Sequence, residues 1–185
     1  MEKSRIDIMC DIETLGRGAD TAVFQIAAAA FKIETGEIVD KFNMICDISN
    51  TKILVDGGTL KWWLNTDKEL LTKLLNQGNC SEQYMFEQFY KWIVILQTKY
   101  EVYFWGNGPL FDNRIIKEKM EMYGMNYPIF YRNDRDLRTL VDIVNVKYNI
   151  DPHKEVQVEN SEYHNATCDV EHQIRVATFC WNKLI

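Results

Sequence analysis

The sequence predicts a single α/β domain. Three strand-like segments come first, and helical segments interrupted by one more short strand follow, a mixture typical of this class. A length of 185 residues suits one domain. No internal repeat and no linker rich in Gly, Pro or Ser divides the chain. We therefore expect residues 1–185 to fold as one unit.

The three N-terminal segments are predicted to form antiparallel strands. Residues Ile6–Glu13 alternate between two faces, which is strand periodicity. Alanine propensity would allow Ala22–Lys32 to be a helix. We favour a strand, because Glu34–Glu37 is typical of a hairpin turn leading into Ile38–Cys46.

Helices account for most of the remaining chain. Ser81 can cap a long aromatic-rich helix whose apolar residues keep a spacing of three to four, and this helix is either core or the face of a homodimer. The apolar run Val102–Trp105, followed by a glycine-rich turn, indicates a buried strand. The other predicted helices are Thr59–Leu64, Lys68–Asn76, Phe111–Tyr123, Arg135–Lys147 and Ala166–Asn182.

Composition and charge exclude several classes of protein. A net charge of −6 argues against a domain held on nucleic acid by bulk positive charge, but not against nucleic acid as a substrate. Five scattered cysteines without a C-x-x-C pair indicate reduced thiols, so we expect a cytoplasmic protein. We expect no membrane partner, because no apolar run approaches the ~18 residues of a membrane span and the N-terminus is no signal peptide.

Paired carboxylates on the first strand indicate a metal site. Asp11 and Glu13 lie two residues apart, so both leave the same face of the sheet. Such neighbours repel each other unless a cation lies between them, and a hard cation prefers oxygen ligands. The small turn Thr14–Gly16 that follows would let a substrate backbone approach closely. By itself, an Asp-x-Glu pair is more typical of a solvated strand face.

Later residues extend this acidic set. Asp112 follows the glycine-rich turn at a strand-to-helix junction, where ligands bind in α/β sheets, although it would also serve as a helix cap. Asp169 falls in the first turn of the last helix, and His164 lies just before that helix. A histidine there suits a general base, or is a surface residue, as we take His153 and His172 to be.

Three segments, in order, resemble the sequence blocks of the DEDDh (DnaQ-like) 3′–5′ exonucleases. These segments are Asp11–Gly16, Asn107–Asp112 and His164–Asp169. Two further stretches, Thr59–Trp63 and Arg135–Thr139, are similar to the branch of phage exonuclease A and exonuclease VIII-like proteins.

The resemblance implies a fold and a set of roles. The fold is ribonuclease H-like: a five-stranded mixed sheet, its first three strands antiparallel, flanked by helices. Only four strands are evident in the pattern, so we place the fifth within residues 126–132. Asp11, Glu13 and Asp169 would ligate one Mg²⁺ or Mn²⁺, and Asp11 would also hold a second. Asp112 would act largely through metal-bound water, and His164 would be the general base.

Further residues are expected to contact the substrate. By the resemblance, Thr14 would contact the terminal sugar and Leu15 would wedge its base. Adjacent helical residues diverge by about 100°, so one of Trp62 and Trp63 should face the cleft, and we assign Trp63 to it. The predicted substrate contacts are Thr14, Leu15, Gly16, Trp63, Asn107 and Arg138.

Arginines near the predicted C-terminal helices have two readings. Arg132, Arg135 and Arg138 would bind phosphates. Alternatively, they belong to a solvated helix face that pairs with Asp134 and Asp136.

The predicted function is a two-metal 3′–5′ exonuclease. It would release nucleoside 5′-monophosphates from single-stranded or overhanging 3′ ends, because two metals can stabilise both the attacking and the leaving oxygen. One alternative is an oligoribonuclease-like phosphodiesterase for very short oligonucleotides. Another is a catalytically idle nucleic-acid-binding module. No motif reports on 2′-hydroxyl contacts, so DNA and RNA both remain candidates.

Overall fold

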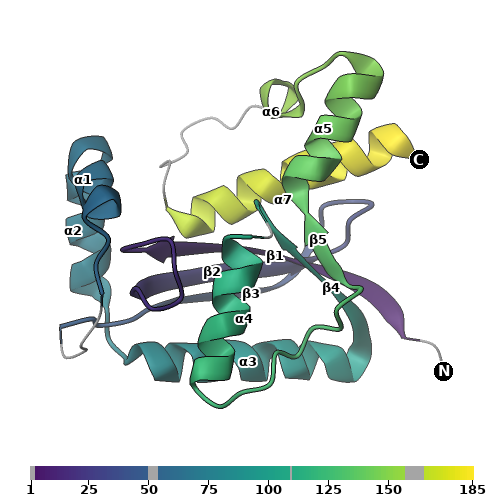
Figure 1. The fold of residues 1–185 in the computed structure, drawn as a ribbon. Helices are drawn as coiled ribbons and strands as arrows, with labels where there is room; N and C mark the ends of the chain where they lie inside the picture. Colours follow the sequence, from purple (N-terminus) through teal and green to yellow (C-terminus); the bar gives the residue numbers. More distant parts are fainter. Residues whose placement is uncertain (1–2, 50–53, 109, 157–164) are drawn as a thin grey trace.

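A five-stranded mixed sheet runs through the middle of the structure, with helices on both of its faces (Figure 1). The structure is a computed structural model that describes residues 3–49, 54–108, 110–156 and 165–185. The strand order is β3-β2-β1-β4-β5. The strands are β1 (Ser4–Thr14), β2 (Val23–Phe31), β3 (Ile38–Ile45), β4 (Tyr100–Gly106) and β5 (Asp134–Asp136).

The predicted antiparallel arrangement of the first three strands is confirmed. β1 pairs antiparallel with β2 and parallel with β4, so it is the central strand. β2 is buried along its whole length between two neighbours, which explains why its alanines adopt strand rather than helix. Ala27 and Ala29 face the C-terminal helix, where small side chains let a helix pack close to the sheet.

Helices of different chain regions cover the two faces. The larger core lies between the sheet and the first four helices, and the smaller core lies beneath α5 and α7 (Figure 1). The helices are α1 (Gly57–Thr66), α2 (Lys68–Gln77), α3 (Glu82–Lys99), α4 (Asp112–Met122), α5 (Leu137–Tyr148), α6 (Pro152–Glu155) and α7 (Ala166–Leu184). Within the described part of the chain, no helix combines the length and apolar character needed to cross a membrane.

The aromatic-rich helix α3 belongs to the core. The Ser81 side chain accepts a hydrogen bond from Tyr84 N and caps the helix, as predicted. Phe86, Phe89 and Ile93 are fully buried against the sheet. Of the two sequence alternatives for this helix, core packing therefore holds, and a homodimer has no support.

The fifth strand differs from its predicted place. It is β5, three residues long, and it pairs in parallel with β4 rather than lying in residues 126–132. Side chains fasten this edge: Asn133 Nδ2 donates to Val102 O, and Tyr127 donates to Asp134. A short polar edge strand has no apolar alternation that a sequence pattern could detect. The helix predicted from residue 135 consequently begins at Leu137, where the Asp136 side chain caps it.

Candidate active site

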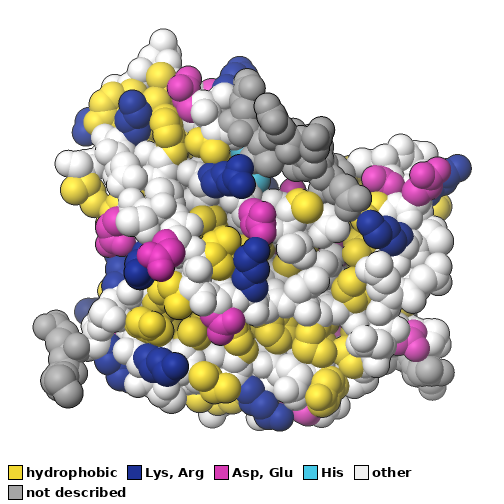
Figure 2. Space-filling view, turned by 180° about the vertical axis from the view of Figure 1, so that it is seen from behind, with side chains coloured by type: hydrophobic (Ala, Val, Ile, Leu, Met, Phe, Trp, Pro, Cys, Tyr) yellow, Lys and Arg dark blue, Asp and Glu magenta, His cyan; other side chains and the backbone are white. Residues whose placement is uncertain are grey.

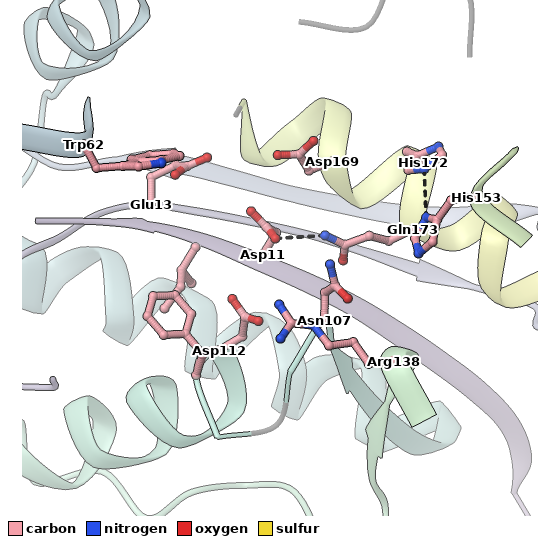
Figure 3. Close-up of a pocket in the computed structure, with 12 residues that line it drawn as sticks. Asp11, Glu13, Trp62, Asn107, Asp112, Arg138, His153, Asp169, His172 and Gln173 are labelled. Carbon is pink, nitrogen blue, oxygen red and sulfur yellow. Dashed lines mark hydrogen bonds between the residues drawn. The ribbon is translucent and has the colours of Figure 1, made fainter. Parts of the chain in front are cut away.

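Three carboxylates gather where β1 meets the start of α7. Asp11, Glu13 and Asp169 each offer an oxygen, and these oxygens lie within 4.8 Å of one another. Strand alternation places the first two on the α7 side of β1, beyond the buried Met9. Figure 3 shows Asp169 above them on the helix.

The first turn of α7 is fixed by its cap. The Asn165 side chain accepts a hydrogen bond from Thr167 N, and the Asn165 carbonyl accepts one from Asp169 N. The helix dipole favours negative charge in this turn. The cap thus holds Asp169 over the C-terminal part of β1, which carries Asp11.

Asp112 reaches the same cavity from the other side of β1. It is the first residue of α4, after Phe111 at the cap position, so it is not the helix cap that the sequence allowed. Its side chain is buried, and β4 ends beside it at Gly106. A Cβ on Gly106 would lie 2.3 Å from Asn113 Oδ1 and 3.3 Å from Asp112 Oδ2, so only glycine leaves room for these side chains.

Burial and mutual repulsion set the electrostatics of the cluster. Burial, followed by the charge of Asp112, raises the pKa of Asp11 well above its ordinary value. Burial and then Asp11 do the same to the pKa of Glu13. Burial raises the pKa of Asp112 to about 7, against hydrogen bonds from backbone N–H groups and the charge of Arg138.

The donor set fits a hard divalent cation. Among the described residues, no ion pair involves Asp11 or Glu13, so their charge is left without a basic partner. Carboxylate oxygens are the ligands that Mg²⁺ and related ions prefer. The group within 4.8 Å holds three of the four predicted ligands. Asp112 lines the cavity but is not part of that group.

A cavity of about 550 Å³ lies over the carboxylates, within the ~300–1,000 Å³ usual for ligand sites. Among the described residues that line it, Arg138 is the single Lys or Arg. The lining residues are Asp11, Ile12, Glu13, Trp62, Asn107, Phe111, Asp112, Arg138, His153, Asp169, His172 and Gln173.

The structure separates the predicted substrate contacts into two groups. Asn107 and Arg138 line the cavity. Thr14, Leu15 and Gly16 do not line it, and their side chains or backbone are buried. Leu15 packs in the larger core, 4% exposed, so its side chain is not placed to wedge a base.

The two tryptophans divide as expected, but in the opposite order. Trp63 is 1% exposed, and its Nε1 donates to Thr14 O 3.0 Å away, so its assignment to the cleft is wrong. Trp62 is 46% exposed and lines the cavity near Glu13 (Figure 3). Within α1, Trp63 is the buried residue, so this helix face packs on the core and Trp62 lies on another face.

Three polar side chains of the cavity, those of Gln173, His153 and His172, were not predicted to belong to the site. Gln173 donates from Nε2 to Asp11 Oδ1 at 2.9 Å. His153 Nδ1 and His172 Nε2 lie 3.4 Å apart at one end of the cavity; His153 is exposed, as predicted, and His172 is half-buried. For His172 and Gln173 the available signal was helical spacing, since positions three and four residues after Asp169 share its face; His153 lies on α6 and had no such signal.

Other predicted residues fall elsewhere. His164 lies outside the described residues. Arg135 donates to the Arg132 and Asp134 carbonyls and stacks on Tyr103. Neither Arg132 nor Arg135 lines the cavity, so of the three arginines only Arg138 faces it.

Solved structures with the same fold are nucleases. The cell-death related nuclease 4 (CRN-4) superposes with a TM-score of 0.70 at 14% identity, over 97% of this chain and 64% of that one. The nuclease domain of 3′hExo, a DEDDh family member bound to rAMP, gives 0.67 at 11% identity, over 96% and 92%. At these low identities, the TM-scores show a shared fold, which is ribonuclease H-like.

Longer proteins share this fold as well. E. coli exonuclease I in complex with single-stranded DNA gives a TM-score of 0.71 at 17% identity, over 95% of this chain and 40% of that one. This chain thus spans less than two thirds of CRN-4 and of exonuclease I.

Sequence comparison identifies the family. No curated protein is similar enough to this chain to count as a match. The narrower likeness to phage exonuclease A and exonuclease VIII-like proteins gains no support from the family comparison. A family model does match residues 6–181, a span that includes all four acids of the cavity. The chain belongs to the family of 3′-5′ exoribonuclease Rv2179c-like domains.

Proposed function

We propose that this chain is a divalent-metal-dependent exonuclease that removes nucleoside 5′-monophosphates from single-stranded 3′ ends. The observation that carries the proposal is the group of three carboxylates within 4.8 Å, set in a cavity of about 550 Å³. The family assignment supports digestion from the 3′ end towards the 5′ end. The carboxylate ligands support the dependence on a divalent metal.

Each acid has a place in this proposal. Asp11, Glu13 and Asp169 would hold the cation. Asp112, which lines the same cavity, would act through water bound to that cation. A bound divalent ion would activate water and neutralise charge on the attacking and leaving oxygens. His164 is proposed as the general base because it precedes Asp169 as in the family's third block; it lies outside the described residues.

The cavity has a different character at each end. Trp62 offers an aromatic face near Glu13, and stacking on aromatics is a sequence-tolerant way to hold a terminal base. Arg138 offers a cation for a phosphate, on the opposite side of Asp11 (Figure 3). The Trp62 end would therefore hold the 3′-terminal base, and the strand would leave past Arg138.

RNA is the favoured substrate, because the family description names an exoribonuclease. The structural relatives include one solved with a histone mRNA stem-loop and one with single-stranded DNA. On the face seen in Figure 2, Lys and Arg lie singly among acids rather than in a patch. The affinity for a long nucleic acid strand would therefore be low, and binding would be concentrated at its 3′ end.

The test is a time course on matched, end-labelled single-stranded RNA and DNA with Mg²⁺ or Mn²⁺. We expect mononucleotides to be released from the 3′ end, and release to be lost in Asp11→Asn. If the wild-type protein binds these strands without shortening them, the domain is an idle binding module.

Short oligonucleotides are a second candidate substrate. A cavity of about 550 Å³ with one arginine has little room or charge for more than the terminal nucleotides. Comparing a dinucleotide with a 20-mer separates the two candidates. A kcat/KM at least about tenfold higher for the dinucleotide would establish the short substrate.

A further inference from the structure

Among the described residues, Gln173 is the side chain that donates to the carboxylate of Asp11. Its Nε2 donates to Asp11 Oδ1 at 2.9 Å, and the glutamine is 4% exposed (Figure 3). It lies on α7, one helical turn after Asp169. One helix therefore carries a candidate metal ligand and the amide that contacts another.

The orientation of this amide is set by the carboxylate. Turning the amide over would direct Oε1 at Asp11 Oδ1, and two acceptors repel. In the orientation present, Oε1 is buried and has no hydrogen-bond partner among the described residues. An unsatisfied buried acceptor costs about 1–3 kcal/mol. The fold thus accepts a cost at Gln173 to keep a donor on Asp11.

The hydrogen bond makes the two carboxylate oxygens of Asp11 unequal. Oδ1 is engaged by Gln173, which fixes the rotation of the carboxylate and leaves Oδ2 for other partners. Groups that orient metal ligands in this way typically change metal affinity or activity by about 10–100-fold when removed.

We propose that Gln173 is a positioning residue that holds the Asp11 carboxylate in the orientation needed to bind the cation. This inference rests on the proposed function. Gln173 itself contacts neither metal nor substrate in it. Its contribution is made through Asp11, and it couples the placement of α7 to the ligand geometry on β1.

The test is Mn²⁺ binding to the full chain by calorimetry, in wild type and Gln173→Met. Methionine keeps an unbranched side chain of similar length but removes the amide. We expect Mn²⁺ affinity to fall at least about tenfold. We expect the thermal unfolding midpoint of the EDTA-treated protein to stay within a few degrees, because one lost hydrogen bond is offset by one removed unsatisfied acceptor.

Two variants make the test specific. Thr178→Val removes another buried, unpartnered polar atom from α7, away from the cavity, and should leave Mn²⁺ affinity unchanged. Gln173→Asn keeps the amide but shortens its reach, so it should behave like the methionine variant. Wild-type Mn²⁺ affinity in Gln173→Asn would contradict the positioning role.

The outcomes separate this inference from the proposed function. If Asp11→Asn abolishes Mn²⁺ binding and Gln173→Met binds within twofold of wild type, the positioning role is overturned and the metal site stands. If the wild-type chain binds no Mn²⁺, the proposed function fails with it.

Discussion

Two acidic sites, one buried and one partly buried, are supported from opposite faces of the sheet and differ in how their charge is compensated. On the side of α3 and α4, Glu82 accepts hydrogen bonds from Val23 N at 2.7 Å, Lys119 Nζ at 2.9 Å and the Tyr123 hydroxyl. On the side of α7, Asp11 accepts one from Gln173 and is surrounded by further acids.

Asp7 follows the pattern of Glu82 rather than that of its strand neighbour Asp11. Arg5 donates to both of its carboxylate oxygens, and Trp105 Nε1 donates to one of them at 2.7 Å. A buried carboxylate with a cation and several donors contributes to the fold. Asp11 and Glu13 have no basic partner among the described ion pairs, so their side of the sheet is suited to binding a cation from outside.

The largest effect expected is at the compensated site. Lys119→Met leaves Glu82 buried without its cation, so the free energy of unfolding should fall by roughly 3–5 kcal/mol. Urea denaturation measures this. Restoring neutrality with Glu82→Gln in the same chain should recover part of the loss. A loss below about 1 kcal/mol would remove the distinction between the two sites.

The metal-free acidic cluster should make stability fall as pH rises. Burial raises the pKa of Asp112 from 3.8 to about 7, and the pKa values of Asp11 and Glu13 are raised as well. The folded state therefore binds more protons than the unfolded state between about pH 4 and 7. The free energy of unfolding should decrease across that window, by roughly 1.4 kcal/mol for each tenfold difference in proton affinity.

Denaturation in EDTA at several pH values measures this slope, and saturating Mn²⁺ should reverse it, because the metal binds deprotonated ligands. If the stability of the metal-free protein rose from pH 5 to pH 7, the acidic cluster would not be the main cause of its pH dependence.

Sequence predicted the acids better than their surroundings. Asp11 and Glu13 follow from alternation along one strand, and Asp112 and Asp169 from their places at helix starts, which are local properties. Gln173 acquires its role only because α7 crosses β1, a contact between residues 162 positions apart.

Two other errors arise from the rotational phase of α1 and from the short length of β5. Assigning Trp62 and Trp63 to cavity and core requires the rotation of α1, which two adjacent tryptophans do not reveal. β5 is three residues of alternating charge at a sheet edge, so its strand state comes from pairing with β4 and not from its own pattern.

Trp62 and Trp63 allow the same contrast, between a residue for function and one for stability, to be tested with the substrate. Trp62→Ala should raise KM for a single-stranded substrate about 5–150-fold, equivalent to 1–3 kcal/mol of stacking, and leave stability nearly unchanged. Trp63→Phe removes the hydrogen bond to Thr14 O and should instead lower the free energy of unfolding by about 1–2 kcal/mol. If Trp62→Ala left KM unchanged, the aromatic end of the cavity would not hold a base.

The smallest expected effect is a change in the free energy of unfolding whose sign should differ between the Asp11 and Glu82 sites. In EDTA at pH 8, Asp11→Asn removes one of several repelling buried charges, so the free energy of unfolding should rise, by about 1 kcal/mol or less. Glu82→Gln should do the opposite, because it leaves Lys119 buried without its carboxylate.

Adding Mn²⁺ should then stabilise the wild type and not Asp11→Asn, as chemical denaturation can show. A loss of stability in both variants under EDTA would mean that Asp11, like Glu82, is retained for the fold. Opposite signs would mean that the fold retains Glu82 on α3 for stability and Asp11 on β1, at a cost to stability, for the cation.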